Sequence, residues 1–388
     1  MDGPSEGTIW DQFKAKGIIS KNFENDELLG GVLITTLHSF LKLRPDNTTK
    51  DKKLVSRLSF DDVKGIKLVI IDECSMLDTE LYNFVCKHLP EVFVLFLGDR
   101  QQLPPIKPDK LGLSISPTFL NHEIFKLEGC QRNSGEILTY CHRILDSIDS
   151  IHVPDYTDLL GDSVQVIDRA DLLDLSIDLI AKETDSTVIA YRNANVDKYT
   201  FNLRKRLYPE KYELLVNEGE RLISNSYTQT FTYEILEDMS GETCKEYDRE
   251  SGTIRKSFYT GEAIQAKDII FATDETYELN WFYIETMFGV IRTIHKSSVK
   301  EWKLILKDAY KEAKKTRNWY RYNFIESTNA NVAYGYAITT HKAQGSTYDT
   351  VIVDLNDMCQ QRKDITLRNK MLYVACSRAA NKLYIIEA

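Results

Sequence analysis

Two short apolar runs in the first third of the chain each end in polar residues. The run over residues 67–71 leads directly into two adjacent acids, and the run over residues 92–97 leads into a Gly-Asp pair. Continuous apolar runs of this length are typical of buried parallel strands, and ligands bind at the carboxyl edge of such sheets. We therefore expect two neighbouring parallel strands that present four polar side chains to one crevice. These side chains are Asp72, Glu73, Asp99 and Gln102.

The pattern of the remaining chain predicts a second parallel layer with a β-rich segment inserted in it. Residues 77–86 have the apolar spacing of a helix. Four later apolar runs are predicted as strands of the second layer, over residues 164–167, 186–191, 351–354 and 382–386. From about residue 216 to 294, short alternating segments are separated by polar turns, which is typical of a small β-barrel. The expected fold class is therefore α/β.

Composition indicates an ordinary globular protein with two or three domains. A chain of 388 residues is long for one core, and 43% hydrophobic with 28% charged residues is usual for a soluble protein. No apolar run reaches membrane-spanning length and the first residues lack signal-peptide character. We expect no membrane partner and a cytoplasmic location, in the host cytoplasm if the source is a virus. The seven cysteines include no C-x-x-C pair, which favours reduced thiols over zinc or disulfides.

Positive charge is concentrated in one segment of an otherwise acidic chain. The net charge is −9, yet residues 296–321 hold nine cations against three acids. Phosphate binding depends on local rather than total charge, so this segment is a candidate nucleic-acid contact. Trp319, Tyr320 and Tyr322 lie at its end, and a base stacked on an aromatic ring contributes roughly 1–3 kcal/mol. A solvated helix that packs its aromatic side on the β-rich segment explains the pattern equally well.

Four segments resemble motifs of superfamily 1 helicases, most closely the 1B branch of RecD-like and Dda-like enzymes. Asp-Glu-Cys-Ser-Met at residues 72–76 and Gly-Asp-Arg-Gln-Gln-Leu-Pro-Pro at residues 98–105 resemble motifs II and III. Residues 335–346, which contain Thr-His-Lys-Ala-Gln-Gly-Ser, resemble motif V, and residues 371–379 resemble motif VI. The resemblance implies an ATP-dependent DNA helicase with two RecA-like domains that moves 5′ to 3′ on single-stranded DNA.

This resemblance implies ATP and Mg²⁺ as cofactors and assigns roles to particular residues. Asp72 would hold Mg²⁺, Glu73 would polarise the attacking water and Gln102 would sense the γ-phosphate. Arg132 would lie near the γ-phosphate, a surface arginine being the alternative. Arg378 would act as an arginine finger, and such fingers can be worth on the order of 10³–10⁵ in rate. Further nucleotide contacts are implied for two residues, Asp99 and Gly345.

The same resemblance implies DNA contacts in three segments. Thr36 and His38 resemble motif Ib, a single-strand contact, although His38 fits a helix start equally well. Asn193 lies at a predicted strand-to-helix turn whose free amides could bind phosphate, and plain capping of the helix explains it equally well. In motif V three side chains would grip the DNA backbone, namely Thr340, His341 and Gln344. The implied partners are single-stranded DNA and fork DNA, bound by a monomer.

The expected domain boundaries follow from these motifs. They are residues 1–30 as an unmatched segment, 31–149 as RecA-like domain 1, 150–215 with 328–388 as RecA-like domain 2, and 216–327 as an inserted SH3-like β domain with the basic helix. Within domain 1, residues 42–64 have a turn-forming centre between short apolar stretches. That pattern fits either an inserted β-hairpin that splits the duplex or a solvated charged loop.

The motif G-x-x-x-x-G-K-[ST], which cradles nucleotide phosphates, occurs nowhere in the chain. Without its lysine and amides the β- and γ-phosphates lose their main cradle, and Mg²⁺ loses a hydroxyl ligand. Because the other motifs keep their chemical residues, we expect a truncated, mis-started or split frame, with the phosphate loop on upstream sequence or an upstream polypeptide. The alternative is a non-hydrolysing single-stranded DNA-binding or accessory protein on a helicase scaffold. DNA replication and DNA repair both fit such a protein.

Overall fold

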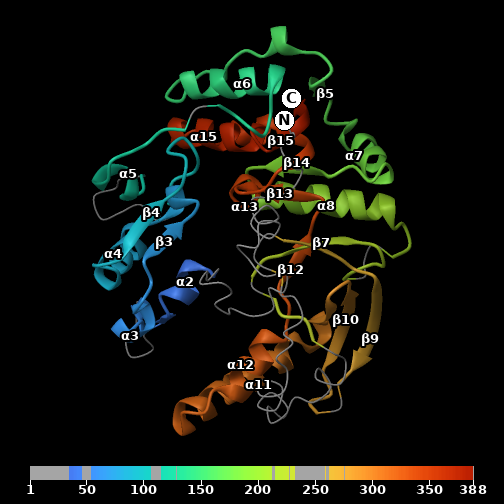
Figure 1. Cartoon of the computed structure of the whole chain (residues 1–388). Coiled ribbons are helices and arrows are strands. Elements are labelled where there is room, and N and C mark those ends of the chain that lie inside the picture. The colour runs from blue at the N-terminus through green and yellow to red at the C-terminus, as the bar shows by residue number, and fades with distance from the viewer. Residues whose placement is uncertain are drawn as a thin grey trace, which may run out of the picture. The chain divides into compact units, whose positions relative to one another are not determined.

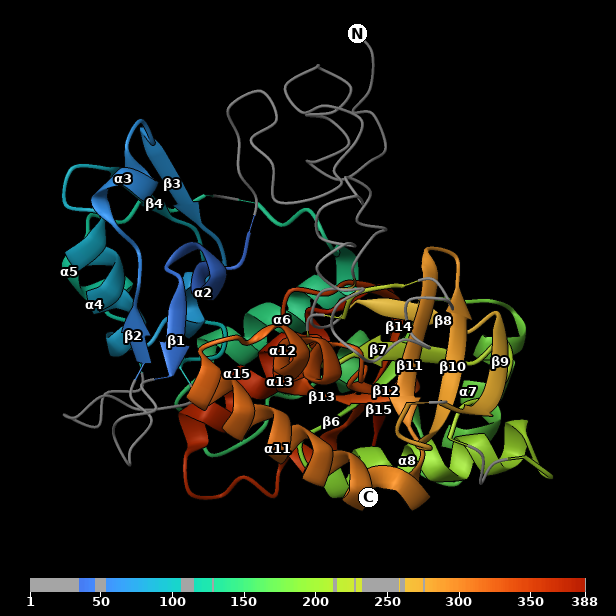
Figure 2. The same ribbon diagram turned by 90° about the horizontal axis from the view of Figure 1, so that it is seen from below.

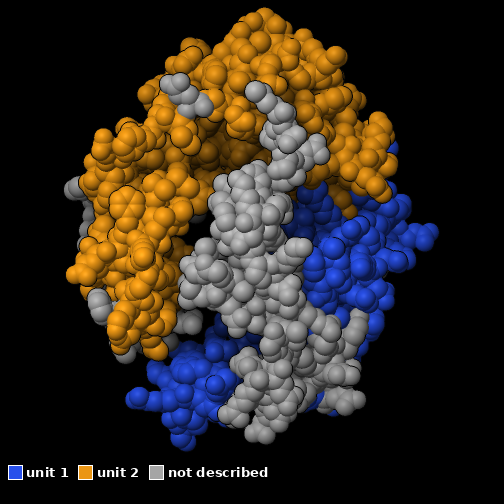
Figure 3. All heavy atoms as spheres, viewed as in Figure 1, with its two compact units in different colours: residues 1–34, 204–335 blue, residues 35–203, 336–388 orange. Residues whose placement is uncertain are grey.

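The computed structural model describes most of the chain, in two compact units. The described residues are 35–45, 54–105, 115–127, 129–211, 215–226, 228–231, 258, 262–274 and 276–387. The expected amino-terminal segment 1–30 and the centre of the expected hairpin at 42–64 lie outside them. The two units are unit 1, residues 1–34 and 204–335, and unit 2, residues 35–203 and 336–388 (Figure 3).

A five-stranded parallel sheet forms the centre of unit 2 (Figure 1). Its strands are β5 (Val164–Ile167), β6 (Ser186–Ala190), β13 (Ala337–Thr339), β14 (Tyr348–Asp354) and β15 (Ala379–Ile386). The order is β13-β6-β14-β15-β5, and every neighbouring pair is parallel. Val351, Ile352 and Val353 of β14 are all buried, as expected for a parallel sheet covered on both faces. The predicted parallel α/β layer is confirmed.

Helices cover this sheet and connect its strands. They are α6 (Gly135–Asp146), α7 (Leu172–Ala181), α8 (Asn193–Leu207), α13 (Thr340–Ala343), α14 (Leu355–Met358) and α15 (Ile365–Cys376). Helices α6 and α15 pack side by side (Figure 1). The fully buried Asn369 of α15 donates hydrogen bonds to Ser147 O, Ile148 O and Ser150 O, at 2.9–3.0 Å. These bonds fix the segment that follows α6 on α15.

A separate pair of parallel strands precedes the predicted acids. β3 (Leu68–Ile71) and β4 (Phe93–Phe96) pair in parallel, and one face of the pair packs on α4 (Thr79–His88). On the other face the side chains are exposed, Ile70 by 55% and Phe93 by 70%. We expected strands buried on both faces, and for this outer face the expectation is wrong. An apolar run indicates that a strand can be buried, but it does not specify what covers it.

The remaining elements of unit 2 are short. They are α2 (Leu37–Phe40), β1 (Leu43–Pro45), β2 (Leu54–Ser56), α3 (Phe60–Val63), η1 (Cys74–Met76), α5 (Thr118–Asn121) and η2 (Thr157–Leu159). β1 and β2 pair antiparallel, with Leu43 opposite Ser56, so both arms of the expected hairpin are present. Helix α3 begins with a capping box in which Ser59 and Asp62 exchange side-chain and backbone hydrogen bonds.

The described residues of unit 1 form two antiparallel sheets and the helices α11 and α12 (Figure 2). One sheet has the order β12-β7-β8 and the other β11-β10-β9. The elements are β7 (Arg221–Ser224), β8 (Ala263–Gln265), β9 (Asp268–Thr273), β10 (Asn280–Thr286), β11 (Gly289–Ile294), η3 (Lys296–Ser298), α11 (Val299–Thr316), α12 (Tyr320–Ser327) and β12 (Val332–Tyr334). The SH3-like form expected for residues 216–327 stays a prediction. In neither unit does a described helix have the length and apolar character needed to cross a membrane.

Candidate active site

The ends of β3 and β4 approach each other closely beside the predicted acids. The Cys74 amide donates to Leu97 O at 2.9 Å, so the parallel pairing continues past both strands. At Gly98 an added Cβ would lie 2.7 Å from Cys74 Sγ and 3.0 Å from Cys74 N. Because a side chain cannot fit at these distances without a shift of the neighbouring strand end, position 98 requires glycine.

Glu73 has a backbone conformation that residues with a side chain seldom adopt. Its φ of 51° and ψ of 39° lie in the left-handed region. The exposed Asp72 supports this turn, because its Oδ1 accepts a hydrogen bond from Glu73 N at 2.8 Å. Backbone strain of this kind costs of order 1–3 kcal/mol and is concentrated at functional sites. The strain therefore marks Glu73 as a candidate functional residue independently of the motif.

Gln344 links the motif V segment to these acids. Its Nε2 donates to Glu73 Oε2 and to Ser75 Oγ, both at 3.2 Å. Its Oε1 is buried and has no hydrogen-bond partner among the described residues. Gly345 follows in the left-handed region, at φ 83°, where an added Cβ would lie 3.7 Å from Glu73 Oε1. The DNA contact expected for Gln344 stays a prediction, and the structure brings the amide nitrogen of this residue to Glu73.

Two arginines donate hydrogen bonds to the ends of the motif V and motif VI segments. Arg132 Nε donates to Thr347 Oγ1 at 2.8 Å, and its Nη1 donates to Ser377 O at 3.4 Å. The side chain of Arg378 is buried and donates to neutral oxygens only in the described structure, to Val374 O at 3.1 Å, Ser346 O at 3.2 Å and Ser377 Oγ at 3.0 Å. Both predicted arginines thus contact the same two chain segments.

The electrostatics of Arg378 favour the binding of an anion. Its pKa is lowered to about 10, mainly by burial and also by the positive charge of Arg132, while the charge of Glu73 acts in the opposite direction. None of the ion pairs in the described part of the chain includes Arg378. Burying a charge without an opposite partner is costly. An anionic group bound between the two guanidinium groups would offset that cost.

The motif III residues occupy the turn after β4. Asp99 Oδ1 accepts from the Gln101 amide at 2.8 Å, and Asp99 Oδ2 accepts from the Tyr373 hydroxyl at 3.1 Å. Gln102 Oε1 is buried and, within the described structure, has no hydrogen-bond partner. Asp99 therefore acts as a turn cap and a link to α15, whereas Gln102 retains an unsatisfied acceptor that a ligand or water could use.

The oxygen ligands available here fit Mg²⁺ bound in part through a nucleotide. Mg²⁺ is typically held by one or two carboxylates together with water and phosphate oxygens. The exposed carboxylate of Asp72 beside Glu73 meets that requirement. Within the described residues no group of three or more acidic, histidine or cysteine side chains is arranged to hold a metal ion alone. The donor set therefore suits a shared metal rather than a site made entirely of protein ligands.

The other predicted DNA contacts lie in different settings. Thr36 caps α2 by accepting from Ser39 N at 3.2 Å, and His38 is exposed. Asn193 is exposed at the start of α8. Thr340 is fully buried and its hydroxyl faces Met358 Sδ at 3.6 Å, so its side chain is not presented to a ligand. The half-buried His341 has a pKa lowered by burial.

Several residues that hold the site together have no role assigned by the motifs. Asn133 Nδ2 donates to Ala379 O at 3.3 Å, and Lys370 Nζ donates to Arg100 O at 2.9 Å. Ser75 and Thr347 accept the bonds from Gln344 and Arg132 described above. Ser75 lies inside the motif II sequence and Asn133 directly follows Arg132, so their positions were a signal. The partners of Lys370 and Thr347 are distant in sequence, so no sequence signal pointed to these two residues.

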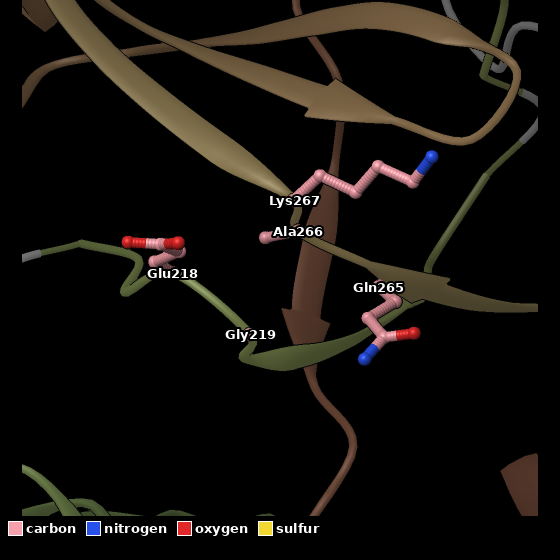
Figure 4. A pocket seen from close by; sticks show the side chains of 5 residues that line it. All are labelled: Glu218, Gly219, Gln265, Ala266 and Lys267. Atoms are coloured by element: carbon pink, nitrogen blue, oxygen red, sulfur yellow. The ribbon is translucent and has the colours of Figure 1, made fainter.

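An open hollow in unit 1 is lined by none of the predicted site residues. Its volume is about 490 Å³ and it is lined by Glu218, Gly219, Gln265, Ala266 and Lys267. In Figure 4 the Lys267 side chain extends away from Glu218, so the charged groups do not converge on one point. The hollow is therefore not a candidate active site.

Two domain families match this chain. An AAA domain matches residues 14–108, and a UvrD-like helicase C-terminal domain matches residues 334–386. The first match begins within the segment 1–30, for which the motifs gave no match. Glu73 lies in the first matched region, and both Gln344 and Arg378 lie in the second.

Relatives extend the similarity over most of the chain. The ATP-dependent DNA helicase Dda of Enterobacteria phage T4 is 24% identical over 417 residues, covering 96% of this chain and 85% of Dda. The ATP-dependent DNA helicase Pif1 of Campylobacter jejuni is 24% identical over 387 residues, covering 91% of this chain and 77% of that protein. A solved structure of Pif1 from Bacteroides in complex with ADP-AlF3 and ssDNA is 17% identical, with a TM-score of 0.45, covering 92% of this chain and 79% of that one.

The domain matches and the relatives support a superfamily 1 DNA helicase of the 1B branch. Within that class the chain is similar to Dda and Pif1.

Proposed function

We propose that this chain binds and hydrolyses ATP at the site around Glu73, Gln344, Arg132 and Arg378, and couples hydrolysis to movement along DNA. Glu73 accepts the proton of the attacking water, and Asp72 supplies a carboxylate ligand to Mg²⁺. When bound, Mg²⁺ neutralises phosphate charge and polarises the phosphoryl group. Arg132 and Arg378 stabilise the charge that develops on the transferred phosphoryl oxygens.

One observation carries this proposal. The buried guanidinium of Arg378 donates only to neutral oxygens in the described structure, beside a second arginine and within the electrostatic influence of Glu73. A structural arginine is normally paired with a carboxylate when it is buried. An arginine that binds a phosphate is not paired with a carboxylate, because the phosphate is its ionic partner.

The unsatisfied amide oxygens of Gln102 and Gln344 support the same chemistry. A water molecule needs hydrogen-bond acceptors to orient it, and both Oε1 atoms are buried without partners in the described part of the chain. The Nε2 of Gln344 is already committed to Glu73 and Ser75. We propose that Gln344 Oε1 helps to orient the water that Glu73 activates, while Gln102 contacts the γ-phosphate.

A second function is favoured by a specific sequence feature. The motif G-x-x-x-x-G-K-[ST] does not occur in the 388 residues, so the usual phosphate cradle is missing from the sequence. A protein with the same frame could bind single-stranded DNA without hydrolysing ATP. We place this alternative second, because it gives Arg378 and the strained Glu73 no chemical task.

DNA-stimulated ATP hydrolysis by the purified chain distinguishes the two functions. Glu73→Gln should lower the rate by roughly 10²-fold or more, in the range of a lost general base. Glu91→Gln is the matched control, because Glu91 is exposed in the turn before β4 and should leave the rate unchanged. Tight binding of single-stranded DNA with no ATP hydrolysis would support the accessory protein instead.

The proposed DNA partners are single strands and forks, with movement from 5′ to 3′. Two relatives are named as DNA helicases and a similar structure contains ssDNA, which supports DNA as the partner. Unwinding of a labelled duplex tests the direction. A duplex with a 5′ overhang should be unwound in preference to one with a 3′ overhang, and the opposite preference would overturn the proposed polarity.

A further inference from the structure

Helix α11 of unit 1 presents a continuous row of lysines to solvent. Five of them follow one another at spacings of three and four residues, and all are exposed. They are Lys300, Lys303, Lys307, Lys311 and Lys314. At 3.6 residues per turn these positions fall on an arc of roughly 80°, and the row is about 21 Å long. We call this set the lysine row.

The lysine row is separated from the apolar side of the same helix. Ala309 and Ala313 are buried, and Trp302, Ile305 and Leu306 pack on the hydrophobic core around Trp281. The apolar side is therefore already used within unit 1. An amphipathic basic helix binds a membrane by inserting its apolar face, which is not available here. This argues against a lipid surface as the partner.

Acidic residues of α11 do not neutralise the row. Glu312 pairs with Arg321 at 2.6 Å, outside the row. Asp308 pairs with Lys311 at 3.0 Å, and both side chains remain more than 60% exposed, so the pair is weak. Lys300, Lys303, Lys307 and Lys314 take part in none of the ion pairs of the described residues. In a chain with a net charge of −9, this is a local concentration of free positive charge.

Three aromatic residues beside the helix pack on one another. Tyr310, Trp319 and Tyr322 pack edge-to-face on one another, with ring centres 5.6–5.7 Å apart. Proteins that bind single strands combine cations with aromatic side chains on which bases stack. Here these three rings are occupied with each other, which favours recognition of phosphate charge over stacking of unpaired bases. Duplex DNA, with one negative charge per about 1.7 Å of axis, presents phosphates without exposed bases.

We propose that the lysine row of α11 binds the phosphate backbone of duplex DNA without sequence preference. Lysine acts as a point charge on phosphate, and such contacts position a protein on a duplex without reading its sequence. The row would thus hold the duplex part of a DNA substrate, in addition to the single strand on which a helicase moves. The interaction needs neither ATP nor the site around Glu73.

The test measures binding of a blunt-ended 20-base-pair duplex of mixed sequence without nucleotide, over a range of salt concentrations. The variant carries Lys300→Gln, Lys303→Gln, Lys307→Gln and Lys314→Gln. Glutamine keeps a similar helix propensity, so the fold of α11 should be retained. The matched control carries Lys87→Gln, Lys182→Gln, Lys211→Gln and Lys382→Gln, four exposed lysines elsewhere that give the same change in net charge.

The slope of log K against log salt is negative, and each lost phosphate contact reduces its magnitude by about 0.9. The slope of the row variant should therefore be smaller in magnitude by roughly 3–4. Its affinity at low salt should fall by about tenfold or more. A variant with Lys→Arg at the same four positions should have the salt slope and the low-salt affinity of the unchanged chain. Single-stranded DNA-stimulated ATP hydrolysis should persist in the row variant, which separates this proposal from the proposed function.

Three results would overturn the proposal. The row variant could bind duplex with an unchanged slope, or the control variant could lose as much affinity as the row variant. The intact chain could also bind phosphatidylserine vesicles through the row while failing to bind duplex. The first two results would exclude a specific role of the row in duplex binding, and the third would assign the row to lipid.

Discussion

Gln344 Nε2 and Glu73 Oε2 are joined by a hydrogen bond of 3.2 Å between residues 271 positions apart in the sequence. The same amide nitrogen bonds Ser75 Oγ, so the segment after α13 is fixed on the segment after β3. The remaining amide oxygen is buried and unsatisfied. Gln344 is therefore placed to act on the acid directly, and we propose that it positions Glu73 and the attacking water.

Gln344→Ala should lower the maximal rate of ATP hydrolysis by roughly 10-fold to 100-fold. The reason is that Glu73 loses its hydrogen-bond donor and the water loses an acceptor, while bound nucleotide loses no direct contact. KM for ATP should therefore change much less than kcat. Gln361→Ala, a change in a half-buried glutamine after α14, is the control. Equal losses in kcat for both variants would contradict a specific role of Gln344.

Gly98→Ala should destabilise the protein by about 1–3 kcal/mol, as expected for overpacking. The new methyl group would lie 2.7 Å from Cys74 Sγ and would force the ends of β3 and β4 apart. Gly161→Ala is a matched control, since no heavy atom beyond its chain neighbours lies within 4 Å of its Cβ position. Urea unfolding measures both variants. A free energy of unfolding unchanged by Gly98→Ala would show that the two strand ends are not packed as described.

Asp357 should position the turn that contains Asn193. Its carboxylate is buried and accepts from Tyr191 N and Arg192 N at 2.8 Å, and from Arg192 Nε at 2.5 Å. Asp357→Asn removes the charge and at least one acceptor, which should cost about 1–3 kcal/mol. If Asn193 contacts DNA, the Kd for single-stranded DNA should also rise. Asp197→Asn, on the exposed side of α8, should change neither quantity. An unchanged Kd despite a loss of stability would remove Asn193 from the DNA site.

The stability of the protein should fall below about pH 6.5, in part because of His341. Burial lowers the pKa of His341 in the folded state below the ordinary value of 6.5. In the window below 6.5 the unfolded chain therefore binds more protons than the folded one, and stability decreases as pH falls. His341→Gln should reduce the drop in Tm between pH 7.5 and 5.5. His38→Gln, a change of an exposed histidine, is the control. His88, whose pKa is also lowered by burial, contributes equally to all three proteins.

Local patterns predicted much of this architecture. The runs before Asp72 and Asp99 became the parallel strands β3 and β4, and the run at 351–354 lies inside β14. The residues that form each of these strands are adjacent in sequence, so the hydrophobic pattern can predict them. The exposed outer face of β3 and β4 was not predicted, because apolar composition indicates which side chains can be buried and not which element covers them.

Contacts between distant segments were the part that patterns could not supply. Arg132 and Thr347 are 215 positions apart, and nothing near either residue indicates that they pair. Gln344 lies in a motif associated with DNA, so only the three-dimensional structure revealed its hydrogen bond to Glu73. The burial of Thr340 is similar, because a hydroxyl residue at a strand end carries no signal of the Met358 sulfur above it.

The central claim is that Arg132 and Arg378 complete, together with Glu73, a site for the terminal phosphate of ATP. Calorimetric titration with ADP and with the slowly hydrolysed analogue ATPγS, both with Mg²⁺, measures this most directly. We predict that the intact chain binds ATPγS at least about tenfold more tightly than ADP, a difference of about 1.4 kcal/mol, and that Arg378→Gln binds the two with equal affinity. Equal binding of both nucleotides by the intact chain, or an undiminished preference in Arg378→Gln, would contradict it.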